Sequence, residues 1–262
     1  MKSRRTAAIA AALFCFALPQ GMAQQPFNND DSPTVPKKKW QFEFLESFDW
    51  LSPKLYPRTR QNTANFSISY GLTDRFEVGL AVPHLAIRSN RWDHGIGDLE
   101  LNSKIQLIPH RPGGDTPEIS LSTKFEFPTG DPKTYLGSGF FDWQNVLIVE
   151  QHLLGTTHRV NTGVVFFGNT STGIEGILID TKVAIYGYSV SREITKRLLL
   201  GAEVSGSAAS HVSFADAEME LLAGGMYKLS RNFELDFAYS KGLKSASPTR
   251  GFVIGFVVSP EE

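Results

Sequence analysis

The sequence predicts an all-β fold: a transmembrane, antiparallel up-and-down β-barrel of about twelve strands, of the outer-membrane type. Three observations predict it. The chain begins with an export signal, apolar and polar residues alternate from residue 40 to residue 259, and tight connections alternate with long ones between the segments that show this period. Together these features are typical of a barrel with short turns at one end and longer loops at the other.

Residues 1–23 have the organisation of a secretory signal peptide. Three basic residues among the first five precede an apolar run at 7–18, and a small-residue triplet ends at Ala23. The run is shorter than the roughly 20 residues that a membrane-spanning helix requires, so we expect cleavage after Ala23. Lipidation at Cys15 is disfavoured because Cys15 lies inside the apolar run, directly after the bulky Phe14.

Composition after export excludes several function classes. Cys15 is the only cysteine in the sequence and leaves with the signal peptide, so the mature chain is expected to have no disulfide and no cysteine metal site. Three of the 26 basic residues leave as well, and 23 basic residues against 27 acidic ones give a formal net charge of −4. Nucleic-acid binding would need a clustered basic excess, so we expect no nucleic-acid partner.

Residues 24–39 form a polar stretch with almost no apolar side chains. Such a segment cannot bury enough apolar surface to order itself, so the sequence predicts a flexible periplasmic N-terminal extension. The alternative is that it reaches into the barrel as a plug. The run Lys37 to Lys39 indicates a solvated flank at a membrane surface more than an interaction tag.

From Trp40 onward the chain alternates with a period of two. Between Ala64 and Tyr70 every second residue is apolar and the others are polar, which predicts a strand with one apolar face. The same pattern predicts strands near 40–50, 61–70, 76–87, 97–108, 118–127, 140–151, 158–168, 181–191, 197–206, 215–227, 233–240 and 251–259. An even number of strands of about ten residues suits a transmembrane barrel, here covering residues 40–259.

Alternation alone does not say which face points outward, because a soluble barrel has the same period with the apolar face inward. The polar face carries charges, as a wet lumen would. The residues predicted to face the lumen are Glu77, Glu100, Asn102, Lys104, Lys124, Glu126, Glu203, Glu218, Glu220, Glu234 and Asp236. Tyr70 and Tyr227 end their strands where an interfacial aromatic belt would lie, although ordinary strand composition also explains them.

Two motifs carry a resemblance to a known family. The segment Gly95-Ile96-Gly97-Asp98-Leu99-Glu100-Leu101 and the segment Phe127-Pro128-Thr129-Gly130-Asp131, with the turn Tyr70 to Arg75, resemble the outer-membrane barrel family named for the MetA pathway of phenol degradation. The resemblance covers most of the mature chain. It implies an outer-membrane location and movement of small, often hydrophobic or aromatic, compounds. The chain departs from barrel precursors in ending Ser259-Pro260-Glu261-Glu262 rather than on the aromatic residue that the insertion machinery reads.

The residue types in these motifs also predict local roles independently of the resemblance. Gly95, Gly97 and Gly130 are expected where strands meet loops, and Pro128 and Thr129 follow the end of a strand. Asp98 and Asp131 can bind a cation or cap turn amides, and capping is favoured. The loop from Thr129 to Phe141 either contacts a solute at the mouth or is an ordinary external loop.

The lumen gives the main functional hypothesis: a channel or transporter for small molecules, with outer-membrane lipids, the barrel-insertion machinery and an unidentified solute as partners. Lys104 and Lys124 share the inner face with Glu100 and Glu126, and either line a passage or form ion pairs that fill space. The excess of acids favours cations or neutral solutes. A barrel with a closed lumen and a structural role is the alternative.

An enzyme is the less favoured class. His211 and Ser213 lie two residues apart, as in outer-membrane phospholipases, but Phe214-Ala215 follows where that family has Asn-Gly, so no catalytic residue is predicted. The six histidines show no metal-ligand spacing, and the sequence predicts no metal and no cofactor. His84 and His94 flank a loop and can meet in space, but a chance pair is favoured.

Overall fold

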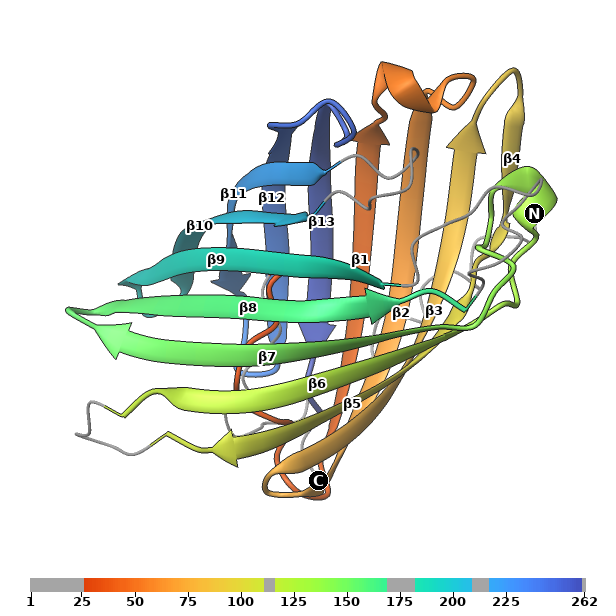
Figure 1. Cartoon of the computed structure of the whole chain (residues 1–262). Coiled ribbons are helices and arrows are strands. Elements are labelled where there is room, and N and C mark those ends of the chain that lie inside the picture. Colours follow the sequence, from red (N-terminus) through yellow and green to blue (C-terminus); the bar gives the residue numbers. More distant parts are fainter. Residues whose placement is uncertain (1–25, 111–115, 169–181, 209–216, 261–262) are drawn as a thin grey trace, which may run out of the picture.

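The computed structural model describes residues 26–110, 116–168, 182–208 and 217–260. The strands in these ranges form one antiparallel sheet (Figure 1). Its strands are β1 (Trp40–Trp50), β2 (Arg60–Thr73), β3 (Phe76–Arg88), β4 (Trp92–Ile96), β5 (Leu99–Ile108), β6 (Glu118–Phe127), β7 (Asp142–Leu153), β8 (Thr156–Phe166), β9 (Lys182–Thr195), β10 (Leu198–Ser207), β11 (Glu218–Lys228), β12 (Phe233–Gly242) and β13 (Arg250–Val258), with two single-turn 3-10 helices at Pro53–Leu55 and Pro132–Thr134. No helix among these residues is long and apolar enough to cross a bilayer.

The sheet closes on itself because β1 pairs with both β2 and β13. Phe44, for example, lies opposite Phe66 on one side and Phe256 on the other. Closure leaves the barrel wall without a free strand edge around its circumference, as a membrane without water requires. In Figure 1 the strands β5 to β9 cross the view at a steep angle to β1 and β13, as tilted strands on opposite walls do. The predicted closed barrel of twelve strands is confirmed.

One strand was not predicted. β5 pairs with the first part of β3, from Phe76 to Ala81, and β4 pairs with its last part, from His84 to Arg88. The barrel wall therefore contains twelve strands, and β4 extends the β3 hairpin beyond it. The alternation in Trp92–Ile96 covers only five residues, which is too short a stretch to distinguish a strand from a loop.

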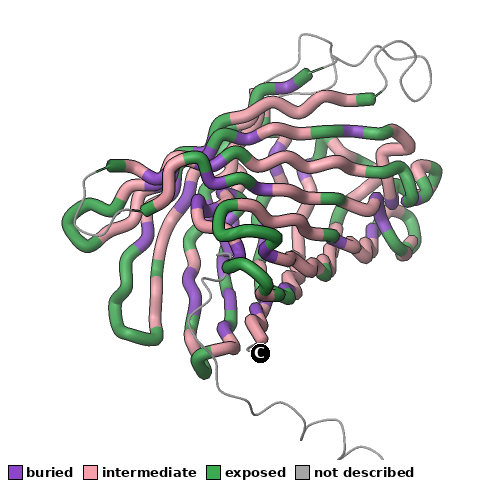
Figure 2. Tube along the Cα trace, turned by 90° about the horizontal axis from the view of Figure 1, so that it is seen from below, coloured by how far each residue is buried: buried purple, intermediate pink, exposed green. Residues whose placement is uncertain are grey.

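The apolar face points outward and the polar face points inward. Phe66 and Ile254 are 55% and 56% exposed on the outer surface, whereas Glu203 and Ser120 are 1% and 0% exposed. The tube in Figure 2 shows this change of burial from residue to residue along the strands. A barrel surrounded by lipid needs an apolar exterior and can have a charged interior, as here. A soluble barrel has the opposite arrangement.

Aromatic side chains gather at both rims of the outer face. At one rim the rings of Trp40 and Tyr70 lie 4.5 Å apart, and at the other the rings of Trp143 and Phe166 lie 4.5 Å apart. Tyr227 is also exposed, close to the first rim. These positions agree with interfacial belts, where rings with one polar edge lie at the level of the lipid headgroups.

The two ends of the barrel differ in their connections. Two-residue turns join β2 to β3, β7 to β8 and β9 to β10, and β1 begins and β13 ends at this same end, which we call the short-turn end. Leu154 in one of these turns has a φ of 52°, and Gly155 follows with a φ of 77°. Longer connections, including 51–59, 128–141 and 243–249, lie at the opposite, long-loop end.

The chain before β1 lies inside the barrel. We call residues 27–35 the luminal segment: Phe27, Asn29, Ser32 and Val35 are all buried, and their neighbours come from the inner wall. The sequence predicted a flexible extension, with a plug inside the barrel as the alternative, and the described segment lies where that alternative placed it. Apolar burial alone would not order such a polar stretch, but hydrogen bonds to charged wall residues do.

The two motif segments meet at the long-loop end. The Asp98 carboxylate accepts hydrogen bonds from the backbone N–H of Gly130 at 2.8 Å and of Ser138 at 2.6 Å. Thr129 Oγ1 accepts from Leu99 N and donates to the Gly97 carbonyl, both at 2.9 Å. A Cβ on Gly130 would lie 2.3 Å from the Leu136 carbonyl oxygen, so the close approach needs glycine. Asp131 caps the following turn through Lys133 N at 3.0 Å.

Replacing Asp98 with alanine should loosen residues 128–141. Hydrogen bonds to a charged group are worth about 1.5–3 kcal/mol each, so the loop should open at least about tenfold more often. Limited proteolysis in proteoliposomes should show faster cleavage between 128 and 141, with heat-modifiable migration of the barrel unchanged. Asp131→Ala is the matched control, because Asp131 caps only its own turn. Equal cleavage rates in the two variants would contradict the role given to Asp98.

Candidate functional site

The candidate site is a cavity inside the barrel. It has a volume of about 580 Å³, and its floor is formed by residues 27–30 of the luminal segment. The charged groups on its surface are six carboxylates and two lysines: Asp30, Glu43, Glu77, Glu100, Glu218, Glu220, Lys104 and Lys124. The charged part of the cavity lining is therefore predominantly acidic.

The structure places the predicted lumen residues as follows. Seven of them line the cavity: Glu77, Glu100, Asn102, Lys104, Lys124, Glu218 and Glu220. Glu126 lies directly opposite Glu100 across the β5–β6 pair, on the same face of the sheet. Glu203 is buried beneath the luminal segment, and Glu234 and Asp236 are buried near the short-turn end of β12.

Lys104 is the centre of an ion-pair network in the lumen. Its Nζ lies 3.1 Å from Asp30 Oδ1 and 3.0 Å from Asp31 Oδ1, and it also donates to the Asp31 carbonyl oxygen at 3.1 Å. Glu77 Oε1 is 3.7 Å away and also contacts the luminal segment, because the Val35 N–H donates to the Glu77 carboxylate. The buried ammonium group of Lys104 on β5 thus interacts with Glu77 on β3 and with two aspartates of the segment, and it holds the segment against the wall.

Glu203 fixes the beginning of the luminal segment. Its two carboxylate oxygens accept from the backbone N–H of Asn28 at 3.1 Å and of Asn29 at 3.0 Å. Gly187 on the neighbouring strand provides the space, because a Cβ there would lie 1.9 Å from the Asn29 side-chain oxygen. Backbone N–H groups of the luminal segment thus hydrogen-bond the buried Glu203 carboxylate.

Glu150 and Ser120 fix the segment further along. The Ser32 N–H donates to Glu150 Oε2 at 3.3 Å, and the Ser32 hydroxyl lies 2.9 Å from the Ser120 hydroxyl. Arg159 Nε lies 2.6 Å from the same Glu150 oxygen. The sequence analysis did not identify Glu150 of β7 and Arg159 of β8 as inner-face residues. The alternation of apolar and polar residues along these two strands would have placed both on the inner face.

The two predicted lysines therefore have different surroundings. Lys104 is buried and bound to the luminal segment, whereas Lys124 is half-buried and pairs with Glu100 at 3.1 Å on the cavity wall. Only the surroundings of Lys104 involve residues from outside the barrel strands. The two lysines could not be distinguished from the sequence, because both occupy inner-face positions on neighbouring strands.

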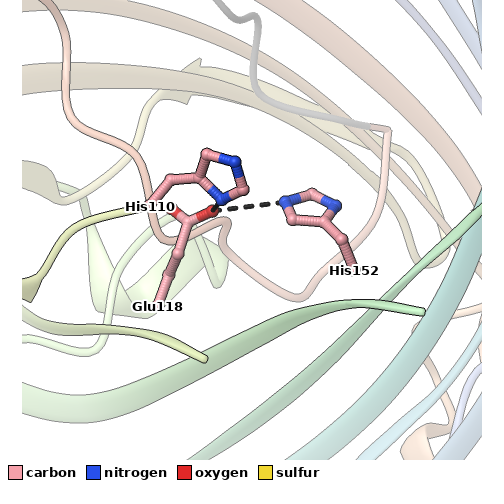
Figure 3. A group of neighbouring side chains, drawn as sticks. All are labelled: His110, Glu118 and His152. Carbon is pink, nitrogen blue, oxygen red and sulfur yellow. Dashed lines mark hydrogen bonds and ion pairs between the residues drawn. The ribbon is translucent and has the colours of Figure 1, made fainter. Parts of the chain in front are cut away.

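The histidines fall into separate places. His110 and His152 come together with Glu118 at the short-turn end, which their spacing in the sequence did not indicate (Figure 3). His84 and His94 meet near the long-loop end with ring centroids 6.0 Å apart. The pair considered for catalysis, His211 and Ser213, lies outside the described residues.

Comparisons with known proteins bear on the fold. No family model and no curated protein matches the chain. Among solved structures, an outer membrane channel from Pseudomonas putida F1 is similar with a TM-score of 0.69 and 12% identity, covering 89% of this chain and all of that one. The KdgM porin has a TM-score of 0.57 and 9% identity over 84% of this chain and 99% of its own.

A third neighbour is the CymD monoaromatic hydrocarbon channel, with a TM-score of 0.51 and 9% identity over 86% of this chain and 90% of that one. At such low identities the likeness shows the fold alone. The fold is that of outer-membrane barrels of Gram-negative bacteria, and these three neighbours are channels and porins rather than enzymes.

Replacing Lys104 with alanine should release the luminal segment. Breaking a buried ion-pair network by removing one partner costs about 3–5 kcal/mol, and three carboxylates would remain close together. Because Ser32 is fully buried, a Ser32→Cys variant should react with a water-soluble thiol reagent at least about tenfold faster in the Lys104→Ala background.

The control for this measurement is Lys124→Ala, which removes an inner-wall lysine that pairs with Glu100. Labelling of Ser32→Cys should stay slow in that background. The same labelling rate in both backgrounds would show that Lys104 does not hold the segment.

Proposed function

We propose that this protein is an outer-membrane channel for small molecules whose passage is narrowed by its own luminal segment. The observation that carries the proposal is the cavity of about 580 Å³ with charged and apolar lining residues inside a closed barrel. A cavity of this size accommodates a small solute. The likeness of the fold to channels and porins supports the same reading.

The charges support a preference for neutral or cationic solutes. Six carboxylates and two lysines face the cavity, and both lysines are already paired with carboxylates. The uncompensated charge is therefore negative, which repels anions from a narrow pathway.

Hydrophobic or aromatic compounds are the solute class that we propose to test first. The motif residues that meet at Asp98 resemble a family with that suspected role, and one neighbour of the fold is a monoaromatic hydrocarbon channel. Apolar side chains such as Phe27, Leu45, Val146 and Ile185 also line the cavity, and an aromatic ring would contact them.

The cellular context belongs to the same proposal. Residues 1–23 act as a signal peptide, the barrel-insertion machinery places residues 40–259 in the outer membrane, and lipids cover the apolar face. In that arrangement the short-turn end faces the periplasm and the long-loop end faces outward, as in other bacterial barrels.

A second candidate is a closed structural barrel. The observation in its favour is the luminal segment itself, since Phe27, Asn29, Ser32 and Val35 are buried against the inner wall and occupy space that a solute would need. The two candidates differ in whether the mature protein conducts.

Planar-bilayer conductance of the refolded mature protein separates them. The channel proposal predicts small current steps that aromatic solutes reduce, and larger steps when residues 27–35 are replaced by a glycine-serine linker of equal length. The linker keeps the chain length and removes the side chains that contact the wall. If the linker variant conducts but the wild type does not, although its heat-modifiable migration shows that it is folded, the result would favour the closed barrel.

Ion selectivity tests the role of the inner-wall charges. Under a salt gradient the reversal potential should show cation preference, and the double variant Glu218→Gln/Glu220→Gln should move it toward zero because two cavity charges are lost. Glu46→Gln is the matched control, since Glu46 lies opposite Ile254 and Ala64 on the outer face. Anion preference in the wild type would contradict the proposed selectivity.

A further inference from the structure

Two histidines and a glutamate converge at the short-turn end of the barrel, next to the luminal segment. His110 follows β5, Glu118 begins β6, and His152 lies near the end of β7. Figure 3 shows both imidazole rings next to the Glu118 carboxylate. Glu118 Oε1 is 3.2 Å from His110 Nδ1 and 3.2 Å from His152 Nε2.

These distances suit a shared metal ion. A tetrahedral ion bound at about 2.1 Å by each ligand atom holds those atoms about 3.4 Å apart. Both nitrogen–oxygen distances are already close to that value, and all three ligand atoms lie within 4.8 Å of one another. Both imidazoles are about half exposed, so their side chains can rotate and an ion can reach them from solvent.

The surrounding groups orient the three ligands. His152 Nδ1 lies 3.0 Å from the Thr157 hydroxyl, which directs Nε2 of the same ring toward Glu118. Gln106 Nε2 donates to Glu118 Oε2 at 3.3 Å, leaving Oε1 toward the histidines. Hydrogen bonds of this kind, made by the non-coordinating atoms of the ligands, are typical of metal sites because they fix the ring orientation and the carboxylate geometry.

We propose that His110, Glu118 and His152 form a binding site for a first-row divalent transition-metal ion of the zinc or copper type. Two imidazoles and one carboxylate are borderline ligands that favour Zn²⁺ and Cu²⁺ over Mg²⁺ and Ca²⁺, which prefer oxygen ligands throughout. Three protein ligands leave at least one position for water or another donor. The proposal does not depend on whether the lumen conducts.

The site would join two hairpins of the barrel wall and lie beside an anchor of the luminal segment. His110 and Glu118 flank the β5–β6 connection, while His152 belongs to the β7–β8 hairpin. Glu150 Oε1 is 3.5 Å from His152 Nε2, and Glu150 Oε2 accepts from Ser32 N. A bound ion would therefore restrict the wall at the point where it holds the segment.

The test is a Cu²⁺ and Zn²⁺ titration of the full mature barrel in detergent, purified without a histidine tag. We expect one tight ion per chain, with Cu²⁺ electron paramagnetic resonance showing coupling to two nitrogens, and no comparable binding of Mg²⁺. His110→Ala and His152→Ala should each weaken binding by more than the roughly 10–100-fold expected for Gln106→Ala. Because both histidines are exposed, these variants should keep heat-modifiable migration.

The double variant His84→Ala/His94→Ala is the matched control, since it removes another pair of histidines that are neighbours among the described residues. It should keep the wild-type affinity and spectrum, as should His211→Ala. Wild-type binding that is unchanged in the double variant His110→Ala/His152→Ala would overturn the proposal. Binding of Zn²⁺ no tighter than that of Mg²⁺ in the wild-type barrel would also overturn it.

Discussion

The need to pair every backbone N–H and C=O group within the sheet is the constraint on which the rest of this structure depends. A hydrocarbon surround offers no hydrogen-bond partners, so the sheet must close, and β1 completes it by pairing with β13. Closure then separates two environments along every strand. Residues of one parity meet lipid and are mostly apolar, while residues of the other parity meet the lumen and can carry charge.

The charged lumen creates a second requirement. Charges in a narrow interior are stable only when they are paired or hydrogen-bonded. Part of the wall meets this requirement itself, as with Lys124 and Glu100, but Lys104 and Glu203 are satisfied by residues that precede the first strand. The luminal segment is thus a structural partner of the wall, and the same contacts narrow the space left for a solute.

Much of the fold could be predicted from the sequence because period-two alternation reports directly on the two environments. The alternation around Phe66 and Ile68 was sufficient for a strand, and the charges at positions such as Glu100 indicated which face is wet. The sequence left the position of the luminal segment open, because its order comes from hydrogen bonds to distant residues, with Asn29 and Glu203 separated by 174 positions. Alternation contains no information about such pairings.

The histidine cluster escaped prediction for a related reason. Metal-site patterns in sequences rely on ligands held at fixed spacings by one helix or turn, whereas a barrel brings residues together across neighbouring strands. His152 lies 34 positions after Glu118 and meets it because β6 and β7 are paired, with Glu118 opposite Glu150. Once the strand register is known, inner-face residues near one rim become neighbours whatever their separation along the chain. In a barrel, the register carries the information that local spacing carries in helical metal sites.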